Sequence, residues 1–92
     1  MSKSLSGFHY EQITVQDKAL GIPHLQAEEV FITLQGSPAR YRYDGEDPDI
    51  VTGHLLYDGM SLRLTSIGQI EKFKFIQTED SPSILSITYE KE

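Results

Sequence analysis

Short blocks in which apolar and polar residues alternate recur along most of this chain, and each block ends near Gly, Pro, Asp or Ser. The clearest block places Val30, Ile32 and Leu34 on one side and ends at Gly36. A period of two predicts a strand, because successive side chains of a strand point to opposite faces. No block keeps a helical period over about 11 residues, and the turns leave no space for the crossover helices of a parallel sheet. We therefore expect an all-β, antiparallel fold.

About seven short strands are expected, at residues 10–16, 28–34, 39–43, 54–57, 60–65, 70–77 and 83–89. Strands this short, separated by turn residues at this spacing, favour an antiparallel β-sandwich with jelly-roll or Greek-key-like connections. Residues 19–27 include Gly21 and Pro23 and support neither a helix nor a strand, so an irregular connection is expected there. The pattern does not give the order of the strands in the sheets.

The chain has 92 residues, which is enough for one domain. Residues 1–7 are polar and Ser-rich and are expected to form a flexible N-terminal tail, and residues 8–92 a single β-sandwich domain. A domain of this size buries about 60–68% of the surface that its unfolded chain exposes, so self-association is an expected source of extra stability. The expected core consists of Val30, Ile32, Leu34, Leu55, Leu62, Leu64, Phe73, Phe75, Leu85 and Ile87.

The net charge is -6, from 14 acidic and 8 basic residues. Such a balance repels phosphate, so neither nucleic acid nor an anionic membrane is expected as a partner. No apolar run approaches the roughly 20 residues of a membrane span, and the N-terminus has no hydrophobic stretch of signal-peptide length. We therefore expect a protein that is cytoplasmic when synthesised. The chain has no Cys, which excludes disulfides and Cys-based zinc sites.

An alternating cationic and aromatic strand, Arg40-Tyr41-Arg42-Tyr43, runs directly into an Asp-Gly turn. The two guanidinium groups suit a carboxylate or phosphate ligand, but ordinary pairing with acidic side chains of a neighbouring strand is favoured. The two Tyr rings suit a sugar-stacking platform, although a place at the edge of the core is again favoured. The candidate binding residues are Arg40, Tyr41, Arg42, Tyr43, His54 and Tyr57.

No catalytic or metal-binding motif stands out. His9, His24 and His54 have no metal-ligand spacing, and the acidic loop 44–49 does not match the order of ligands in a calcium loop, so a solvated hairpin loop is favoured there. The chain has neither a Cys nucleophile nor a Gly-x-Ser-x-Gly elbow. We expect no enzyme, no catalytic residues, no metal and no cofactor. The distances that join His54, Asp44 and Asp58 would test for a cluster of ionisable groups.

One part of the chain, from about Ala27 to Tyr89, resembles small β-sandwich proteins encoded among the structural genes of tailed bacteriophages and prophages. The resemblance is carried by residues 30–34 before Gly36, Ala39-Arg40-Tyr41-Arg42, Asp44-Gly45 with Pro48, and Gly53-His54-Leu55-Leu56. Asp49 stands where Thr or Ser often follows that Pro, and the first 26 residues match nothing in the pattern. The resemblance implies a virion component or accessory, without catalytic residues, that is repeated in a symmetric assembly.

Two functions from different classes follow. The leading one is a non-enzymatic structural or interaction protein, a homo-oligomer whose other partners are virion proteins, with Phe31 as the expected oligomer contact. The alternative for Phe31 is that both faces of its strand are buried within one subunit. The second function is a carbohydrate- or small-ligand-binding module that uses the tyrosines of the central segment and the neighbouring arginines.

Overall fold

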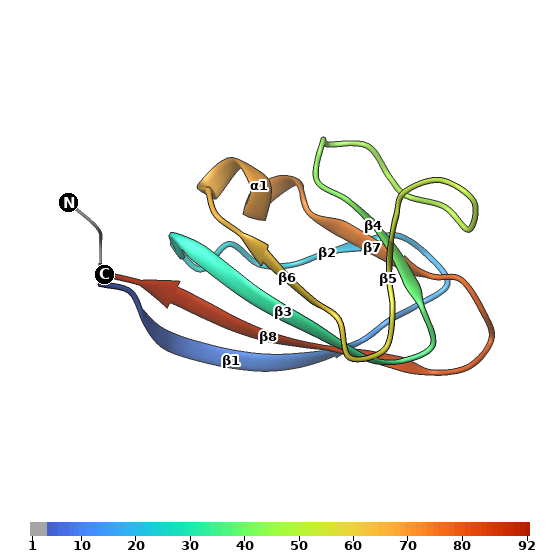
Figure 1. The fold of residues 1–92 in the computed structure, drawn as a ribbon. Coiled ribbons are helices and arrows are strands. Elements are labelled where there is room, and N and C mark those ends of the chain that lie inside the picture. The colour runs from blue at the N-terminus through green and yellow to red at the C-terminus, as the bar shows by residue number, and fades with distance from the viewer. Residues whose placement is uncertain (1–3) are drawn as a thin grey trace.

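Two four-stranded antiparallel sheets face each other in the computed structural model, which describes residues 4–92 (Figure 1). The first sheet has the order β1-β8-β3-β6, with bounds Ser6–Thr14, Ser83–Lys91, Glu29–Gly36 and Ser61–Leu64. The second has the order β2-β7-β4-β5, with bounds Leu20–Gly21, Lys74–Gln77, Ala39–Arg42 and His54–Leu56. The expected all-β antiparallel sandwich is confirmed.

The strand order is that of a jelly roll. Strands pair from the two ends of the chain inward, β1 with β8, β2 with β7, β3 with β6 and β4 with β5. These four pairs lie alternately in the first and the second sheet. The chain is therefore one long folded hairpin that is rolled across two layers. No helix among the described residues is long and apolar enough to cross a membrane.

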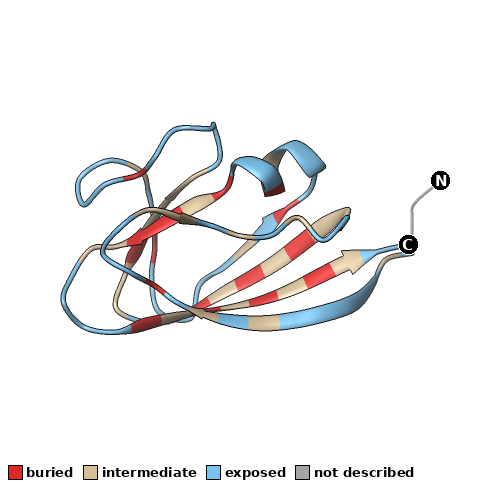
Figure 2. Cartoon of the chain, turned by 180° about the vertical axis from the view of Figure 1, so that it is seen from behind, coloured by how far each residue is buried: buried red, intermediate tan, exposed pale blue. Residues whose placement is uncertain are grey.

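The core lies between the two sheets and is built by the inward faces of β3 and β8. Ile32 stands opposite Ile87 in these neighbouring strands, and both are fully buried. Buried and half-buried residues alternate along both strands, as the period-two pattern predicts (Figure 2). Eight expected core residues are buried: Val30, Ile32, Leu34, Leu64, Phe73, Phe75, Leu85 and Ile87. The buried residues that the sequence pattern did not indicate are Val15, Ala27, Ala39, Leu56, Ile70, Ile76 and Tyr89.

The expectation for β5 was wrong about which leucine faces inward. Leu56 is buried and Leu55 is only half-buried on the other side of the strand. Leu56 stands opposite the buried Ala39 of β4, so these two side chains share the inward face. A strand of three residues gives no alternation from which this could be read. Leu62, also expected in the core, is half-buried and packs against its edge.

The strand expected at residues 70–77 is in part a helix. Its first residues belong to α1, Ile67–Lys72, and only Lys74–Gln77 form β7. The Ser66 hydroxyl caps the helix by accepting from the Gln69 N–H, and the Gln69 side chain accepts from the Thr65 N–H at 2.7 Å. Reciprocal bonds of this kind satisfy N–H groups that a helix start leaves without partners. One turn and a half is too short for a helical period to stand out.

The first third of the chain also differs in detail from expectation. The connection expected to be irregular contains the two-residue strand β2, which brings the number of strands in residues 4–92 to eight. The first strand begins at Ser6, which pairs with Lys91, so β1 overlaps the tail expected over residues 1–7. Residues 1–3 of that expected tail lie outside the described residues.

Candidate functional site

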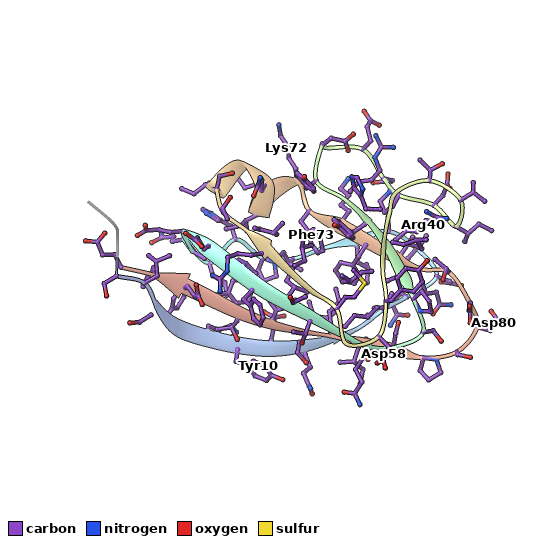
Figure 3. The ribbon with its side chains drawn as sticks, in the orientation of Figure 1. Tyr10, Arg40, Asp58, Lys72, Phe73 and Asp80 are labelled. Carbon is purple, nitrogen blue, oxygen red and sulfur yellow. The ribbon has the colours of Figure 1, made fainter. Side chains whose placement is uncertain are left out.

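The Arg-Tyr strand forms β4, and it continues through a long loop, residues 43–53, into β5. Tyr41 stands opposite His54 across the two strands, and their rings are 5.3 Å apart between centroids. The Tyr41 ring also lies 5.8 Å from that of Phe73, which is buried between the sheets (Figure 3). Burial, followed by the charge that Tyr43 carries when ionised, raises the pKa of Tyr41. Tyr41 therefore belongs to the edge of the core, as favoured from the sequence.

Tyr43 extends this aromatic strip toward solvent. Its ring is nearly parallel to that of Tyr41, with 6.4 Å between centroids, and lies 6.2 Å from the imidazole of His54. The side chain is exposed. Tyr41 thus packs against the core, and Tyr43 presents a ring that a ligand can reach.

Arg40 holds the loop against β4 (Figure 3). Its Nε donates to the carbonyl oxygen of Ile50 at 3.1 Å, and its Nη1 donates to that of Gly53 at 2.7 Å. Gly53 has φ +131°, and a Cβ there would stand 3.1 Å from the Tyr41 carbonyl oxygen. Glycine is required because the loop backbone passes this close to β4 in a conformation that other residues rarely adopt.

Arg42 binds an acid of its own loop. Its Nε donates to Asp44 Oδ1 at 3.0 Å and its Nη2 donates to Asp44 Oδ2, which makes a forked pair. The hydrogen bond from Arg42 lowers the pKa of Asp44 to about 2, and the bond to Asp44 raises the pKa of Arg42. The pairing favoured from the sequence, with acids on a neighbouring strand, is therefore wrong for both arginines. The loop folds back on β4 and offers nearer partners.

The other acids of the loop also stabilise its shape. Asp49 Oδ1 accepts from the backbone N–H groups of Val51 and Thr52 at 2.8 and 2.7 Å, and the first of these bonds is the main cause that lowers the pKa of Asp49. Asp47 pairs with Lys74 of β7 at 2.7 Å. Carboxylates that bond to nearby backbone N–H groups form turns of this kind, in agreement with the favoured hairpin loop.

A pocket of about 550 Å³ opens where β4 leads into the loop. It is lined by Arg42, Tyr43, Asp44, Thr52, Gly53 and His54. The pocket thus combines a phenol ring, an imidazole, a forked ion pair and a hydroxyl, which together suit a small polar ligand with one apolar face.

The structure brings together only part of the predicted set. Arg42, Tyr43 and His54 line the pocket, Tyr41 lies behind it against His54, and Arg40 is engaged by the loop backbone. Asp44, Thr52 and Gly53 also line the pocket but were not among the predicted site residues. The sequence could have indicated them only by their position, because they lie next to the two strands at either end of the loop.

The far end of β5 carries the remaining candidates. Tyr57 follows that end and is exposed, without a place in the pocket lining. Asp58 Oδ1 accepts from the Gly36 N–H at 2.9 Å, which ties the turn after β5 to the end of β3. His54 and Asp44 share the pocket, but Asp58 lies beyond the opposite end of the strand, so the three side chains do not converge. Across residues 4–92, no three His, Asp or Glu side chains are grouped so that they could hold a metal ion.

Phe31, the expected oligomer contact, lies on the outward face of the first sheet. It is half-buried, and the Arg63 guanidinium stands 5.2 Å over its ring. Arg63 in turn pairs with Glu29 at 3.2 Å and with Glu90 at 2.6 Å. The cross-strand charge pairing expected for the Arg-Tyr strand is found here instead. The role of Phe31 in self-association stays a prediction.

Comparison of the chain with models of protein families, with curated proteins and with solved structures finds no match.

Proposed function

We propose that this protein is a non-enzymatic structural and interaction protein that works as a homo-oligomer, as a component associated with the particle of a tailed phage or prophage. The observation that carries the proposal is the edge strand β1. It is nine residues long, and seven of the nine residues are exposed (Figure 2). It pairs with β8 on one side, and no strand of the described part of the chain pairs with its other side (Figure 1).

Such an edge presents unpaired backbone N–H and C=O groups, which are a template for a strand of another molecule. The other three sheet edges of residues 4–92 are β6, β2 and β5, of four, two and three residues. Short edges are one of the devices that prevent association, and so are Lys and Pro within an edge strand. β1 is long and contains neither Lys, Arg nor Pro.

The proposal that the protein is part of a phage particle rests on its fold and on the resemblance of its motifs. Jelly rolls recur in viral capsid proteins and in lectins, and a small domain of this kind gains stability when it packs in a closed symmetric assembly. A fold hosts many functions, so this supports the proposal by analogy. The particular setting is proposed from the motifs of residues 27–89 alone, which resemble those of small phage structural proteins.

Two measurements test the proposal. Multi-angle light scattering over the micromolar range should give a mass that is a multiple of 10.4 kDa. Mass spectrometry of purified particles from a host that carries the gene should detect the chain in a fixed ratio to the major particle proteins. A strict monomer would contradict the homo-oligomer, and absence from the particles would contradict the setting.

The pocket favours a second candidate, a carbohydrate- or small-ligand-binding module. The exposed Tyr43 ring lies beside His54, and Asp44 and Thr52 supply polar groups in the same pocket. Shallow sugar-binding sites combine an aromatic ring with polar groups in this way. A glycan array should then give hits that Tyr43→Ala abolishes. Tyr57→Ala is the matched control, because Tyr57 is also exposed and lies outside the pocket. An array without hits, or equal loss in both variants, removes this candidate.

A further inference from the structure

We propose that two copies of the chain pair through β1, antiparallel, with Tyr10 opposite Tyr10 of the second copy. The two first sheets then join into one continuous sheet of eight strands. This inference rests on the proposed self-association and names the surface and the register that bring it about.

The backbone groups that β1 offers follow from its pairing with β8. The Val15 N–H donates to the Ser83 carbonyl at 2.9 Å, which marks this residue pair as hydrogen-bonded. In an antiparallel ladder, bonded and non-bonded pairs alternate. The regular register from His9 to Thr14 therefore directs the N–H and C=O groups of Tyr10, Gln12 and Thr14 away from β8.

Five two-fold registers bring outward groups of these residues face to face. They are centred on Tyr10, Glu11, Gln12, Ile13 or Thr14. A centre at Glu11 sets two carboxylates directly opposite each other, which is destabilising. The centres at Gln12, Ile13 and Thr14 all need the Thr14 carbonyl, which already accepts from the Gln16 side chain at 3.4 Å. The centre at Gln12 also sets Glu11 against the apolar Ile13.

The register centred on Tyr10 sets an imidazole opposite a carboxylate. It places His9 opposite Glu11 of the second copy, and the two-fold axis repeats this pair. The two residues then form a non-bonded pair, in which opposite side chains are closest. Within one strand, His9 Nε2 already lies 3.6 Å from Glu11 Oε2. The four side chains therefore form one alternating cluster across the two strands.

The exposed Tyr10 ring of β1 supports the same register. Tyr10 is 57% exposed and points away from the body of the protein (Figure 3). In the paired form the two Tyr10 rings lie side by side on the outward face, so they lose contact with water. A bulge between Gly7 and His9 ends the regular ladder on that side.

Single cysteines test the register, because the chain contains none of its own. Tyr10→Cys should form a disulfide-linked dimer under mild oxidation, since directly opposite residues have Cα atoms about 5.5 Å apart, within disulfide range. The matched control is Gln12→Cys. In this register the two introduced cysteines are about 14 Å apart and should not link. Linking of Gln12→Cys in preference, or of neither variant, overturns the inference.

Gln12→Pro tests the pairing itself in the full chain. The Gln12 N–H points away from β8, so proline removes no backbone bond of the monomer, and circular dichroism should show an unchanged fold. The exposed bond from Gln12 Nε2 to Ser86 Oγ, 3.3 Å long, is lost in Gln12→Pro and in Gln12→Ala alike. The substitution deletes the bonds on both sides of the two-fold axis, and the dimer dissociation constant should rise about tenfold or more. Gln12→Ala keeps the N–H and should leave the dissociation constant nearly unchanged.

The outcomes separate the two proposals. A wild-type protein that is monomeric contradicts the proposed function and this inference together. A wild-type oligomer that neither Gln12→Pro weakens nor Tyr10→Cys links contradicts this inference alone, and self-association then uses another surface, such as the one around Phe31.

Discussion

Arg40 and Arg42 lie two residues apart on one strand, yet their hydrogen bonds should contribute very different amounts to the stability of the protein. Replacing Arg40 by Met keeps the apolar stem and removes the guanidinium that holds Ile50 and Gly53. Replacing Arg42 by Met removes a pair with Asp44 that is exposed to solvent. We predict that Arg40→Met destabilises the protein far more than Arg42→Met.

The magnitude follows from the two bonds. The bond to the Gly53 carbonyl is partly buried and short, so a charged donor there contributes about 1.5 kcal/mol. The bond to the Ile50 carbonyl is exposed, and water offsets most of its loss, which leaves about 0.5 kcal/mol. The sum, about 2 kcal/mol, corresponds to a fall in midpoint of about 8–16 °C for a domain of this size. The exposed pair of Arg42 is screened by solvent and should change the midpoint only slightly.

Urea unfolding followed by circular dichroism measures the free energies, and hydrogen exchange of the loop amides shows where protection is lost. Arg40→Met should speed exchange across residues 43–53, and Arg40→Lys, with its single nitrogen, should fall between it and the wild type. Equal stabilities for Arg40→Met and Arg42→Met, or unchanged exchange of the loop in Arg40→Met, would refute the reasoning that Arg40 holds the loop.

Two other predictions concern single side chains. Leu56→Ala should cost about 2–5 kcal/mol of unfolding free energy and Leu55→Ala much less, because only Leu56 is buried; urea curves of equal midpoint would contradict this. The pKa of Asp44 is lowered to about 2 from 3.8, so the ionised carboxylate stabilises the fold at pH values above 3.8. This stabilisation is lost as the pH falls through the lowered pKa of about 2. Carbon NMR should follow the titration, and in Arg42→Met the pKa should return toward its ordinary value.

The candidate site was only partly predictable. The alternation of Arg and Tyr correctly separated the two kinds of side chain onto opposite faces of β4, with Tyr41 at the edge of the core. The partners of the arginines depend on how residues 43–53 fold back over the strand, and that path is fixed by bonds to loop carbonyls and by Gly53. Tyr57 looked equivalent to Tyr43, but a strand of three residues carries it to the other end of the hairpin.

The sequence by itself determined the fold class, the places of most strands and most of the core. These properties follow from period-two alternation and from turn residues, which act over a few neighbouring positions. Only the tertiary structure decided the jelly-roll order, the burial of the Leu56 side chain, the short helix α1 and the position of β1 at the edge of its sheet. Each of these depends on pairing between segments far apart in the chain, such as residues 6–14 with residues 83–91, and local alternation is the same whichever strand lies alongside.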